Sequence, residues 1–308
     1  MTQPVESTVR YRGRFAPSPT GPLHLGSLLA AVGSYLEARS HGGEWLLRIE
    51  DLDPPREMAG AADGILRTLE AFGFEWDGPV EYQSRRLDRY RTALEKLKRA
   101  GQAYGCACTR KEIADSSVRG IDGPVYPGTC RTGLPAGREA RAWRLRVTPG
   151  AYIHFDDAIQ GPQQQDLEQQ LGDFVLLRAD GFFAYQLAVV VDDAEQGISH
   201  IVRGADLLDS TPRQIYLQSC LAYPQPKYAH LPVLVNTAGE KLSKQTRAPA
   251  LITETATSEL WQVLDMLGQM PPKGLLKASI ADLWDWALPN WQLQRVPTAP
   301  VVVPTAQG

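Results

Sequence analysis

Strands and helices alternate over the first hundred residues of this chain, and that alternation limits the fold more than any other feature. Residues 11–17 predict a short strand and a loop, and the segment EWLLRIED predicts a buried strand. Between them, apolar side chains recur at helical spacing at Leu28, Leu29, Val32, Tyr35 and Leu36. Residues 57–72 repeat the helical spacing. A chain that alternates in this way predicts an α/β fold with a parallel sheet.

The alternation then gives way to a segment of different character. Glycine, proline and cysteine accumulate over residues 101–137, and the chain from Ala142 onward is rich in strand patterns. The run FFAYQLAVVV predicts a strand at the centre of a parallel sheet, so we expect the core to resume near residue 185. A helix over 211–221, a strand in HLPVLVN and a helical region to about residue 288 follow. The sequence therefore predicts a doubly wound parallel sheet with an insertion between its halves, and a ligand site where the halves meet.

Composition excludes several classes of protein. The chain has 308 residues, of which 43% are hydrophobic and 22% charged, as in ordinary globular proteins. No stretch approaches 18 consecutive apolar residues, and the first residues lack the apolar centre of a secretory leader, so we expect a cytoplasmic protein that does not enter a membrane. Only four cysteines are present, and Cys106 and Cys108 are too close in sequence to form an unstrained disulfide. Reduced thiols or a metal site remain.

The small net charge of −3 hides a basic segment. Residues 85–146 carry fifteen Lys or Arg against six Asp or Glu, so the rest of the chain is acidic. A solvated helix face and a surface that contacts phosphates are both compatible with this charge. The motifs in the sequence are needed to distinguish these two interpretations.

The segment RFAPSPTGPLHLGSLLAA predicts a site for an anion. An extended stretch turns and enters a helix near Leu25, where backbone N–H groups have no partner within the helix. Gly26 allows a ligand to approach the backbone, and His24 and Ser27 can donate hydrogen bonds to a phosphate. Without further motifs, the same pattern is also compatible with simple helix capping.

A second motif, GEKLSKQ at residues 239–245, follows a predicted strand and a turn. Together with R-F-A-P-S-P-T-G-x-L-H-x-G, it resembles the paired signatures of the glutamate-type class I aminoacyl-tRNA synthetases. That resemblance implies a Rossmann-like catalytic core that binds ATP with Mg²⁺ through His24, Gly26, Ser27, Lys241 and Lys244. It also implies catalytic roles for His24 and for the two lysines, with Lys244 stabilising the charge on departing pyrophosphate and Lys241 assisting.

The same resemblance implies a pocket for L-glutamate. The matching positions are Arg14, Phe15, Ala16, Pro17, Ser18, Glu50, Tyr185 and Arg203. An acid for the ammonium group and an arginine for the side-chain carboxylate are what such a substrate requires. Each residue also has an ordinary alternative: Glu50 as an acid at the end of a strand, Tyr185 as a core aromatic, and Arg203 as a partner in an ion pair. We expect the nearby Asp51, Asp53 and Arg56 to form a structural polar cluster.

Three cysteines, Cys106, Cys108 and Cys130, lie within 25 residues. Zinc takes four ligands, and spacing alone leaves open either a metal site or three reduced thiols. A water, Glu112 or Asp115 would complete the set, whereas the resemblance implies Tyr126 as the fourth ligand of one structural Zn²⁺. Cys220 lies in an apolar helical context and is expected to pack in the core.

Only 64 residues follow Lys244, which leaves room for a short helical cap and no separate anticodon-binding domain. Over residues 10–288 the chain resembles the short, glutamyl-queuosine branch of this class. The resemblance implies ATP-dependent activation of L-glutamate to glutamyl-adenylate without tRNA, and transfer to the queuosine base at the wobble position of tRNA(Asp). The basic segment would then contact RNA phosphates, with Arg85, Arg86 and Arg89 as hypothetical contacts.

We therefore expect five regions along the chain. They are residues 9–102 and 187–246 as the two halves of the catalytic core, 103–186 as an inserted α+β subdomain with the zinc site, 247–288 as a helical region, and 289–308 as a loose tail. Two alternatives remain open for the function. One is a truncated glutamyl-tRNA synthetase that charges a tRNA 3′ end, and the other is an inactive paralogue that binds RNA or an amino acid. A monomer is the default expectation.

Overall fold

The computed structural model describes residues 10–121, 123–242 and 249–303. Within these ranges, no helix is long and apolar enough to cross a membrane. The helices and strands follow in the order β1 (Arg12–Phe15), α1 (Leu25–Ser40), β2 (Glu44–Ile49), η1 (Pro54–Arg56), α2 (Ala61–Ala71), β3 (Glu81–Tyr82), η2 (Gln83–Arg85), α3 (Leu87–Arg99), β4 (Ala103–Cys106), α4 (Arg110–Ser116), β5 (Arg119–Gly120), β6 (Gly123–Pro124), β7 (Ala142–Leu145), β8 (Tyr152–Asp157), β9 (Gly161–Asp166), α5 (Leu167–Gln170), β10 (Phe174–Leu177), α6 (Tyr185–Glu195), β11 (His200–Gly204), η3 (Ala205–Ser210), α7 (Thr211–Leu221), β12 (Lys227–Leu231), β13 (Leu234–Val235), η4 (Thr253–Thr255), α8 (Ala256–Met266), η5 (Lys273–Lys277), α9 (Ile280–Asn290), η6 (Leu293–Arg295) and β14 (Val301–Val302).

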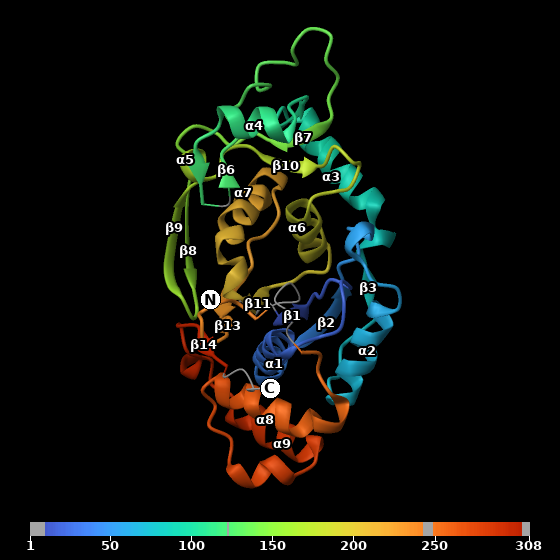
Figure 1. Cartoon of the computed structure of the whole chain (residues 1–308), viewed down its shortest axis with the longest axis vertical. Helices are drawn as coiled ribbons and strands as arrows, with labels where there is room; N and C mark the ends of the chain where they lie inside the picture. The colour runs from blue at the N-terminus through green and yellow to red at the C-terminus, as the bar shows by residue number, and fades with distance from the viewer. Residues whose placement is uncertain (1–9, 122, 243–248, 304–308) are drawn as a thin grey trace, which may run out of the picture.

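Parallel strands from both halves of the chain form the centre of the molecule (Figure 1). β1 pairs with β2 and β2 with β3, while β11 pairs with β12, all in parallel. The two groups meet where the backbone N–H of Ser199 donates to the carbonyl of Arg12 at 3.0 Å, which places β11 beside β1. Strands β1 and β11 are therefore neighbours although Arg12 and Ser199 are 187 residues apart in sequence, and the expected α/β fold with parallel sheets is confirmed.

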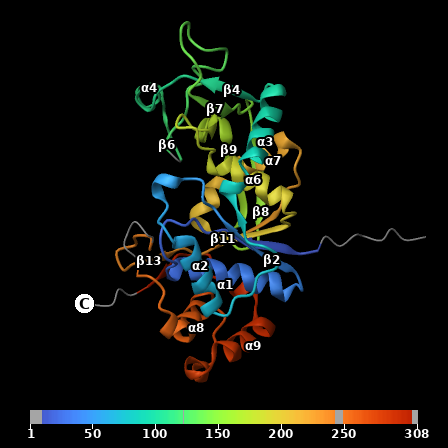
Figure 2. The ribbon, with the colours of Figure 1, turned by 90° about the vertical axis from the view of Figure 1, so that its right-hand side faces the viewer.

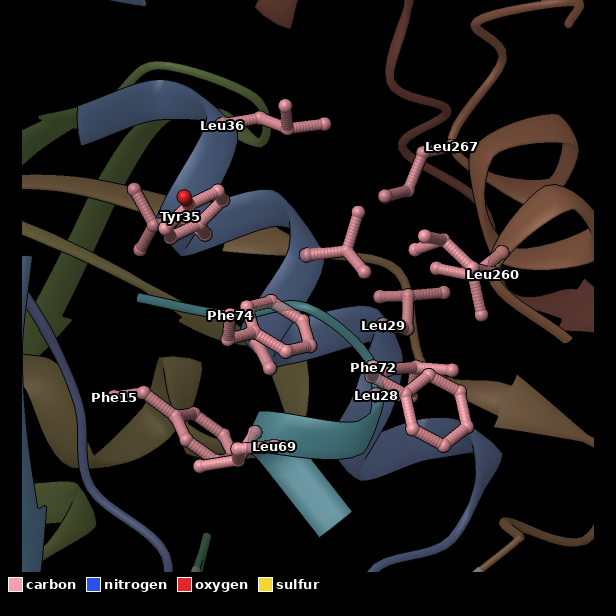
Figure 3. Close-up of a cluster of buried hydrophobic side chains, with 14 of the residues drawn as sticks. Phe15, Leu28, Leu29, Tyr35, Leu36, Leu69, Phe72, Phe74, Leu260 and Leu267 are labelled. Carbon is pink, nitrogen blue, oxygen red and sulfur yellow. The ribbon is translucent and has the colours of Figure 1, made fainter. Parts of the chain in front are cut away.

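The largest apolar core surrounds α1, whose buried stripe was expected from the sequence. Figure 3 shows Leu28, Leu29 and Leu36 of this helix facing Leu260 and Leu267, which come from the α8 region. On another side, the Trp45 ring of β2 stacks on Phe74 with ring centroids 5.5 Å apart. Burial of aromatic and aliphatic side chains on several sides of one helix stabilises this half of the molecule, and Trp45 also donates from its indole N–H to Ser34 Oγ of α1 at 3.0 Å.

The inserted region lies at one end of the elongated molecule and the C-terminal helices α8 and α9 at the other (Figures 1 and 2). Its sheet is antiparallel, in the order β10, β7, β4, and packs on α3 and α6 through a second apolar core. A hairpin of β8 and β9 connects back to the core, because Tyr228 of β12 pairs in parallel with Asp157 of β8. The insertion is thus tied to the catalytic core by strand pairing as well as by packing.

One predicted strand is wrong. FFAYQLAVVV does not form a central strand: from Tyr185 onward it belongs to helix α6, which spans Tyr185–Glu195. Residues Leu187 to Asp193 are all buried, because α6 is enclosed between the inserted sheet and α7 (Figure 1). A continuous apolar run in a buried helix has no periodicity that distinguishes it from a central strand. The β-branched valines of this run favoured the prediction of a strand.

The expectation of a loose tail over residues 289–308 is also wrong for its described part, residues 289–303. Trp291 is buried, and its indole N–H donates to the Glu37 carboxylate of α1 at 2.6 Å. Farther along, β14 pairs in parallel with β13. Proline and polar residues dominate this segment, so its sequence pattern resembled disorder although a few anchoring contacts order it.

Candidate active site

A cavity of about 1530 Å³ opens at the carboxyl ends of the central parallel strands. Its wall includes Ala16 and Pro17 after β1, Glu50 after β2, and Arg203 near the end of β11. The edge formed by the carboxyl ends of parallel strands is where α/β folds bind ligands. The predicted site residues that line this cavity are Arg14, Phe15, Ala16, Pro17, Ser18, His24, Gly26, Ser27, Glu50, Tyr185, Arg203 and Lys241.

The N-terminus of α1 forms one wall of the cavity. His24 is its N-cap, and the Nδ1 atom of His24 accepts from the backbone N–H of Ser27 at 3.3 Å. A Cβ atom at Gly26 would lie 3.1 Å from the His24 ring and 3.6 Å from the carbonyl of Leu242, so glycine keeps a narrow passage open. Because His24 accepts through Nδ1, its other ring nitrogen is the one that can donate to an anion. Capping and anion binding are therefore compatible here.

Below the cavity, a buried acid fixes two arginines. Asp193 of α6 accepts from Arg14 Nε at 3.1 Å and from Arg48 Nη2 at 2.7 Å. Burial alone would raise the pKa of Asp193, but the two guanidinium groups outweigh burial and lower it. Arg48 is fully buried and also lies 3.9 Å from Asp192. Charged groups that are paired in this way hold Arg14 at a fixed position in the cavity wall.

Glu50 lies beside this network, and one of its oxygens makes no hydrogen bond. This atom, Oε1, lies 3.5 Å from Arg48 Nη2 in an ion pair but has no hydrogen-bond partner within the described residues. Burial raises the pKa of Glu50 to about 7, against the opposing effects of Arg48 and Arg14. A buried carboxylate that lacks a donor is a binding group for a cation such as an ammonium.

Arg203 of β11 also lines the cavity, but its partners differ from those of Arg14. Its Nε donates to His230 Nε2 at 3.1 Å, and its Nη2 donates to Thr211 Oγ1 at 2.8 Å. Nη1 is buried and has no hydrogen-bond partner in the described part of the chain. Tyr185, whose pKa is raised by burial, also lines the cavity near the charges of Arg203 and Glu50. An arginine with an unused nitrogen in a cavity wall offers a site for a carboxylate.

The structure describes only one of the two lysines of the second motif. Lys241 lines the cavity, and its ammonium group forms an ion pair with Asp206 of η3. Lys244 falls in residues 243–248, outside the described ranges. The described chain before it follows β13 and a turn, in which the Asn236 N–H donates to the Glu240 carbonyl at 2.9 Å, and ends at Lys241 and Leu242, which both line the cavity.

Of the polar cluster predicted from the sequence, Asp53 and Arg56 pair with each other, while Asp51 pairs with Ser84. Asp51 accepts from the backbone N–H and the hydroxyl of Ser84, and Asp53 forms ion pairs with Arg56 and Arg178. Asp53 and Arg56 also line the cavity. Their pairing positions the loop after β2 at the cavity entrance.

The cysteines and Tyr126 converge at the far end of the insertion. The sulfur atoms of Cys106, Cys108 and Cys130 lie within 4.8 Å of one another. The Tyr126 hydroxyl oxygen is 3.3 Å from Cys106 Sγ and 3.5 Å from Cys108 Sγ, and it accepts from the Cys130 backbone N–H at 3.0 Å. A tetrahedral zinc with Zn–S bonds of about 2.3 Å requires sulfur atoms about 3.8 Å apart. The separation of 3.6 Å between Cys108 and Cys130 fits that requirement.

The other candidates for a fourth ligand have different contacts. Glu112 is committed to Arg138, at 2.8 Å, and to the backbone N–H of Thr109 in the N-terminal cap of α4. Asp115 is exposed on the same helix. Within the described ranges, it is not one of the side chains that lie close enough to the cysteines to hold a metal ion with them. Cys220 is partly buried against the second apolar core, as expected.

The structure separates the three arginines proposed to contact RNA. Arg86 is held by Asp192 at 2.7 Å and Glu195 at 2.7 Å, so it is part of the scaffold. Arg85 is exposed and lies over the Tyr82 ring, and the Arg89 side chain is 66% exposed. Only the latter two are therefore presented to a partner.

Sequence reasoning missed several buried polar residues that support the site. Asp192 and Asp193 follow three valines, and His230 lies in the apolar segment YAHLPVLV. Charged or polar residues inside an apolar run are rarely buried without a partner, so these patterns were available as signals. Their partners lie up to 179 residues away in sequence, as for Arg14 and Asp193, and spacing could not identify them.

Comparisons with known proteins agree with this geometry. The family model for the catalytic domain of class I tRNA synthetases of the E and Q type matches residues 10–266. The glutamyl-Q tRNA(Asp) synthetase of Chromobacterium violaceum is 64% identical over 97% of this chain and 99% of its own length. The protein of the same name from Dechloromonas aromatica is 64% identical over 95% of this chain and 98% of its own length.

A solved structure is similar over nearly the whole chain. The crystal structure of a glutamate tRNA ligase from Elizabethkingia meningosepticum in complex with its amino acid has a TM-score of 0.79 and 26% identity, covering 95% of this chain and 67% of that chain. The chain therefore belongs to the ligases of the class I tRNA synthetase family for glutamate and glutamine, and within it to the glutamyl-Q tRNA(Asp) synthetases.

Proposed function

We propose that this chain activates L-glutamate with ATP in the absence of tRNA and transfers the glutamyl group to the queuosine base at the wobble position of tRNA(Asp). The observation that carries the proposal is that one cavity is lined by two buried groups of opposite charge, each with an atom that makes no hydrogen bond within the described residues: Glu50 Oε1 and Arg203 Nη1. The names of the relatives supply the acceptor. The chemistry of the cavity supplies the amino acid.

Glutamate carries one ammonium group and two carboxylates, and the cavity offers a partner of opposite charge for each end. Glu50 is assigned to the ammonium group and Arg203 to the side-chain carboxylate, with the segment Arg14 to Ser18 and Tyr185 enclosing the carbon chain. Glutamine lacks the second negative charge and would leave Arg203 buried without an anion. The cost of an unpaired buried charge favours glutamate.

Activation is an in-line displacement at phosphorus. An oxygen of the α-carboxylate attacks the α-phosphorus of ATP, the new C–O–P bond forms, and the bond to the bridging oxygen of pyrophosphate breaks. The N-terminus of α1, with His24, Gly26 and Ser27, is assigned to the phosphates, and Lys241 and Lys244 to the charge that develops on pyrophosphate. Mg²⁺ bound with the nucleotide would supply further positive charge at the phosphates.

Transfer completes the reaction. A hydroxyl group of the queuosine cyclopentenediol attacks the carbonyl carbon of the adenylate, an ester forms, AMP leaves with the bonding electrons, and the hydroxyl proton is released. The exposed Arg85 and Arg89 lie after Gln83, which itself lines the cavity. We assign these arginines to the RNA backbone near the reacting nucleotide.

We also propose one structural Zn²⁺ held by Cys106, Cys108, Cys130 and the Tyr126 oxygen. The four donor atoms already lie at the mutual separations described above, and Arg144 places a positive charge over the Tyr126 ring at 4.0 Å. Hydrogen bonding with Tyr126 and Arg144 outweighs burial and lowers the pKa of Cys106, whereas burial and the neighbouring thiols raise the pKa of Cys108, so Cys106, and not Cys108, favours the thiolate before a metal binds. The metal would join the loops of the insertion and takes no part in the chemistry at the cavity.

Exchange of labelled pyrophosphate into ATP tests the activation step. The proposal predicts exchange that requires glutamate, proceeds without tRNA, and is at least about 100-fold weaker with glutamine at the same concentration. Exchange that appears only when tRNA is added would favour a truncated synthetase that charges a 3′ end. No exchange from folded protein containing zinc, with or without tRNA, would favour the inactive paralogue.

A further inference from the structure

We infer that His230 and Asp157 are positioning residues that fix the guanidinium group of Arg203, so that its free nitrogen, Nη1, meets the side-chain carboxylate of the amino acid. The inference deepens the proposed function and rests on it for the identity of the substrate. Neither residue was identified from the sequence, and neither lines the cavity. Their role is seen only in the hydrogen bonds behind Arg203.

Asp157, at the end of β8, is the fixed end of this chain of hydrogen bonds. Its Oδ1 accepts from the backbone N–H groups of Ile159, Gln160 and His230 at 3.0, 2.8 and 3.0 Å. Its Oδ2 lies 2.5 Å from His230 Nδ1. Burial opposes ionisation, but these hydrogen bonds outweigh it and lower the pKa of Asp157. The carboxylate is therefore an acceptor, and the proton of the imidazole must be on Nδ1.

His230 passes this constraint to Arg203. The side chain is fully buried in β12, and burial lowers its pKa, so the imidazole is neutral. With its proton on Nδ1, the imidazole has a lone pair on Nε2, which accepts from Arg203 Nε at 3.1 Å. Thr211 Oγ1 accepts from Arg203 Nη2 at 2.8 Å. These two hydrogen bonds fix the edge of the guanidinium group that carries Nε and Nη2.

The partners of Arg203 differ from those of the other buried arginines at the cavity. Arg14 and Arg48 each contact Asp193 directly, so a carboxylate offsets much of their charge. Arg203 makes its side-chain hydrogen bonds to a neutral imidazole, a hydroxyl group and the backbone carbonyl of Leu207, and the carboxylate of Asp157 lies one ring farther away. Its positive charge is consequently available to a ligand. A carboxylate satisfies that charge better than an amide, so this arrangement also favours glutamate over glutamine.

The tautomer of His230 provides a direct test. In Asp157→Asn the amide NH₂ can donate to Nδ1, which moves the proton to Nε2 and turns that atom from an acceptor into a donor facing Arg203. His230→Leu removes the acceptor altogether, whereas His230→Gln keeps an acceptor oxygen close to the position of Nε2. We expect the KM for glutamate in pyrophosphate exchange to rise about 100-fold in D157N and H230L, and less than about tenfold in H230Q. The KM for ATP should change by less than about threefold in all three variants.

Tyr228→Phe is the matched control for lost stability. Tyr228 lies on the same strand, and its hydroxyl group bonds only to Gln218 among the interactions described. Its removal deletes a buried hydrogen bond without touching those of Arg203. We expect a similar loss of melting temperature and an unchanged KM for glutamate.

Two further measurements separate this inference from the proposed function. Nitrogen-15 shifts of the His230 ring in the wild-type protein should show the Nδ1–H tautomer, and those in D157N the Nε2–H tautomer; an Nε2–H tautomer in the wild type would overturn the inference. Calorimetry should show weaker glutamate binding in D157N than in wild type even if adenylate never forms. Equal glutamate affinity in wild type and D157N would also overturn it, whereas wild-type protein that binds glutamate without exchange would refute the proposed function alone.

Discussion

The cavity of the catalytic core and the cysteine cluster of the insertion hold their polar side chains in opposite ways. In the core, Arg14 and Arg48 are fixed by Asp193 on strands and helices packed against large apolar side chains. In the insertion, Cys106, Cys108 and Cys130 are adjacent on short strands and loops with few apolar neighbours. The core can therefore form its binding groups before any ligand arrives, whereas the loops around the three thiols have little apolar packing, and we propose that a bound cation fixes them.

Lys244 gives the largest expected effect on the core's chemistry. Lys244→Ala should lower the rate of glutamate activation by about 10² to 10³-fold while glutamate binding changes little, because the lysine acts on charge that develops as pyrophosphate leaves. Pyrophosphate exchange at saturating glutamate measures the rate. Lys273→Ala, an exposed lysine in η5, is the control. A loss of less than tenfold in K244A would remove this lysine from the catalytic step.

Glu50→Gln tests whether a binding group of the core lowers the free energy of unfolding. We expect glutamate affinity to fall by about 10²-fold, since the amide cannot offset the ammonium charge. The ligand-free variant should nevertheless be more stable than wild type at pH 8, by about 1 to 3 kcal/mol, because an ionised buried carboxylate is removed. Glu44→Gln, at the other end of β2, should leave glutamate affinity unchanged.

The pH dependence of the wild type follows from the same residue. Folding raises the pKa of Glu50 from 4.5 to about 7, so between these values the folded state binds the proton more tightly than the unfolded state. The contribution of Glu50 to stability is therefore present below pH 4.5 and is lost as the pH rises to 7. Glutamate affinity should change in the opposite direction and increase as Glu50 ionises. Urea unfolding would measure the stability, and calorimetry the glutamate affinity, across this pH range, with E50Q as the reference. If the assignment of Glu50 is wrong, neither quantity will show this dependence on pH.

The insertion should respond to loss of its metal. Cys108→Ser should bind less than a tenth of an equivalent of zinc and transfer glutamate to tRNA about 30-fold more slowly, with pyrophosphate exchange reduced by less than about threefold. Cys220→Ser, which changes a cysteine outside the cluster, should retain one zinc per chain. Wild-type protein with under a tenth of an equivalent by metal analysis would contradict the zinc proposal.

The smallest expected effect is on the RNA surface. Arg85→Ala combined with Arg89→Ala should lower the rate of transfer about five- to tenfold and reduce its dependence on salt, since phosphate contacts release counterions. Activation without tRNA should not change. Arg91→Ala, on the same helix and with 62% of its side chain exposed, is the matched control. An equal effect of both variants would mean that general charge, rather than this surface, attracts the RNA.

Sequence patterns predicted the elements that carry local signals. The strand and helix before and after His24, the buried strand just before Glu50 and the helix over 211–221 all occur, because turns, periodicity and helix stops depend on nearby residues. Helix α6 was mistaken for a strand because its burial on all sides erased its helical period. The ordering of residues 289–303 depends on contacts such as Trp291 with Glu37, which no local pattern encodes.

The residues of the candidate site also fall into two groups, those that belong to a sequence motif and those that do not. Arg14, His24, Glu50 and Arg203 were found because they belong to motifs, and the structure places all four around one cavity. The residues that hold them, among them Asp193, Asp157 and His230, belong to no motif and act over long distances in sequence. Only the fold reveals such partners, because burial and hydrogen bonding are properties of the packed chain.

Transfer of labelled glutamate, with ATP, to tRNA from cells that make queuosine and from cells that cannot tests the central claim most directly. The 3′-terminal nucleotides should first be removed enzymatically, because periodate, which is used to block 3′ ends, would also cleave the diol of queuosine. The account predicts label on the trimmed, queuosine-containing tRNA and none on tRNA that lacks queuosine. Label on both kinds of intact tRNA, lost from both after trimming, would contradict it and show charging of the 3′ end.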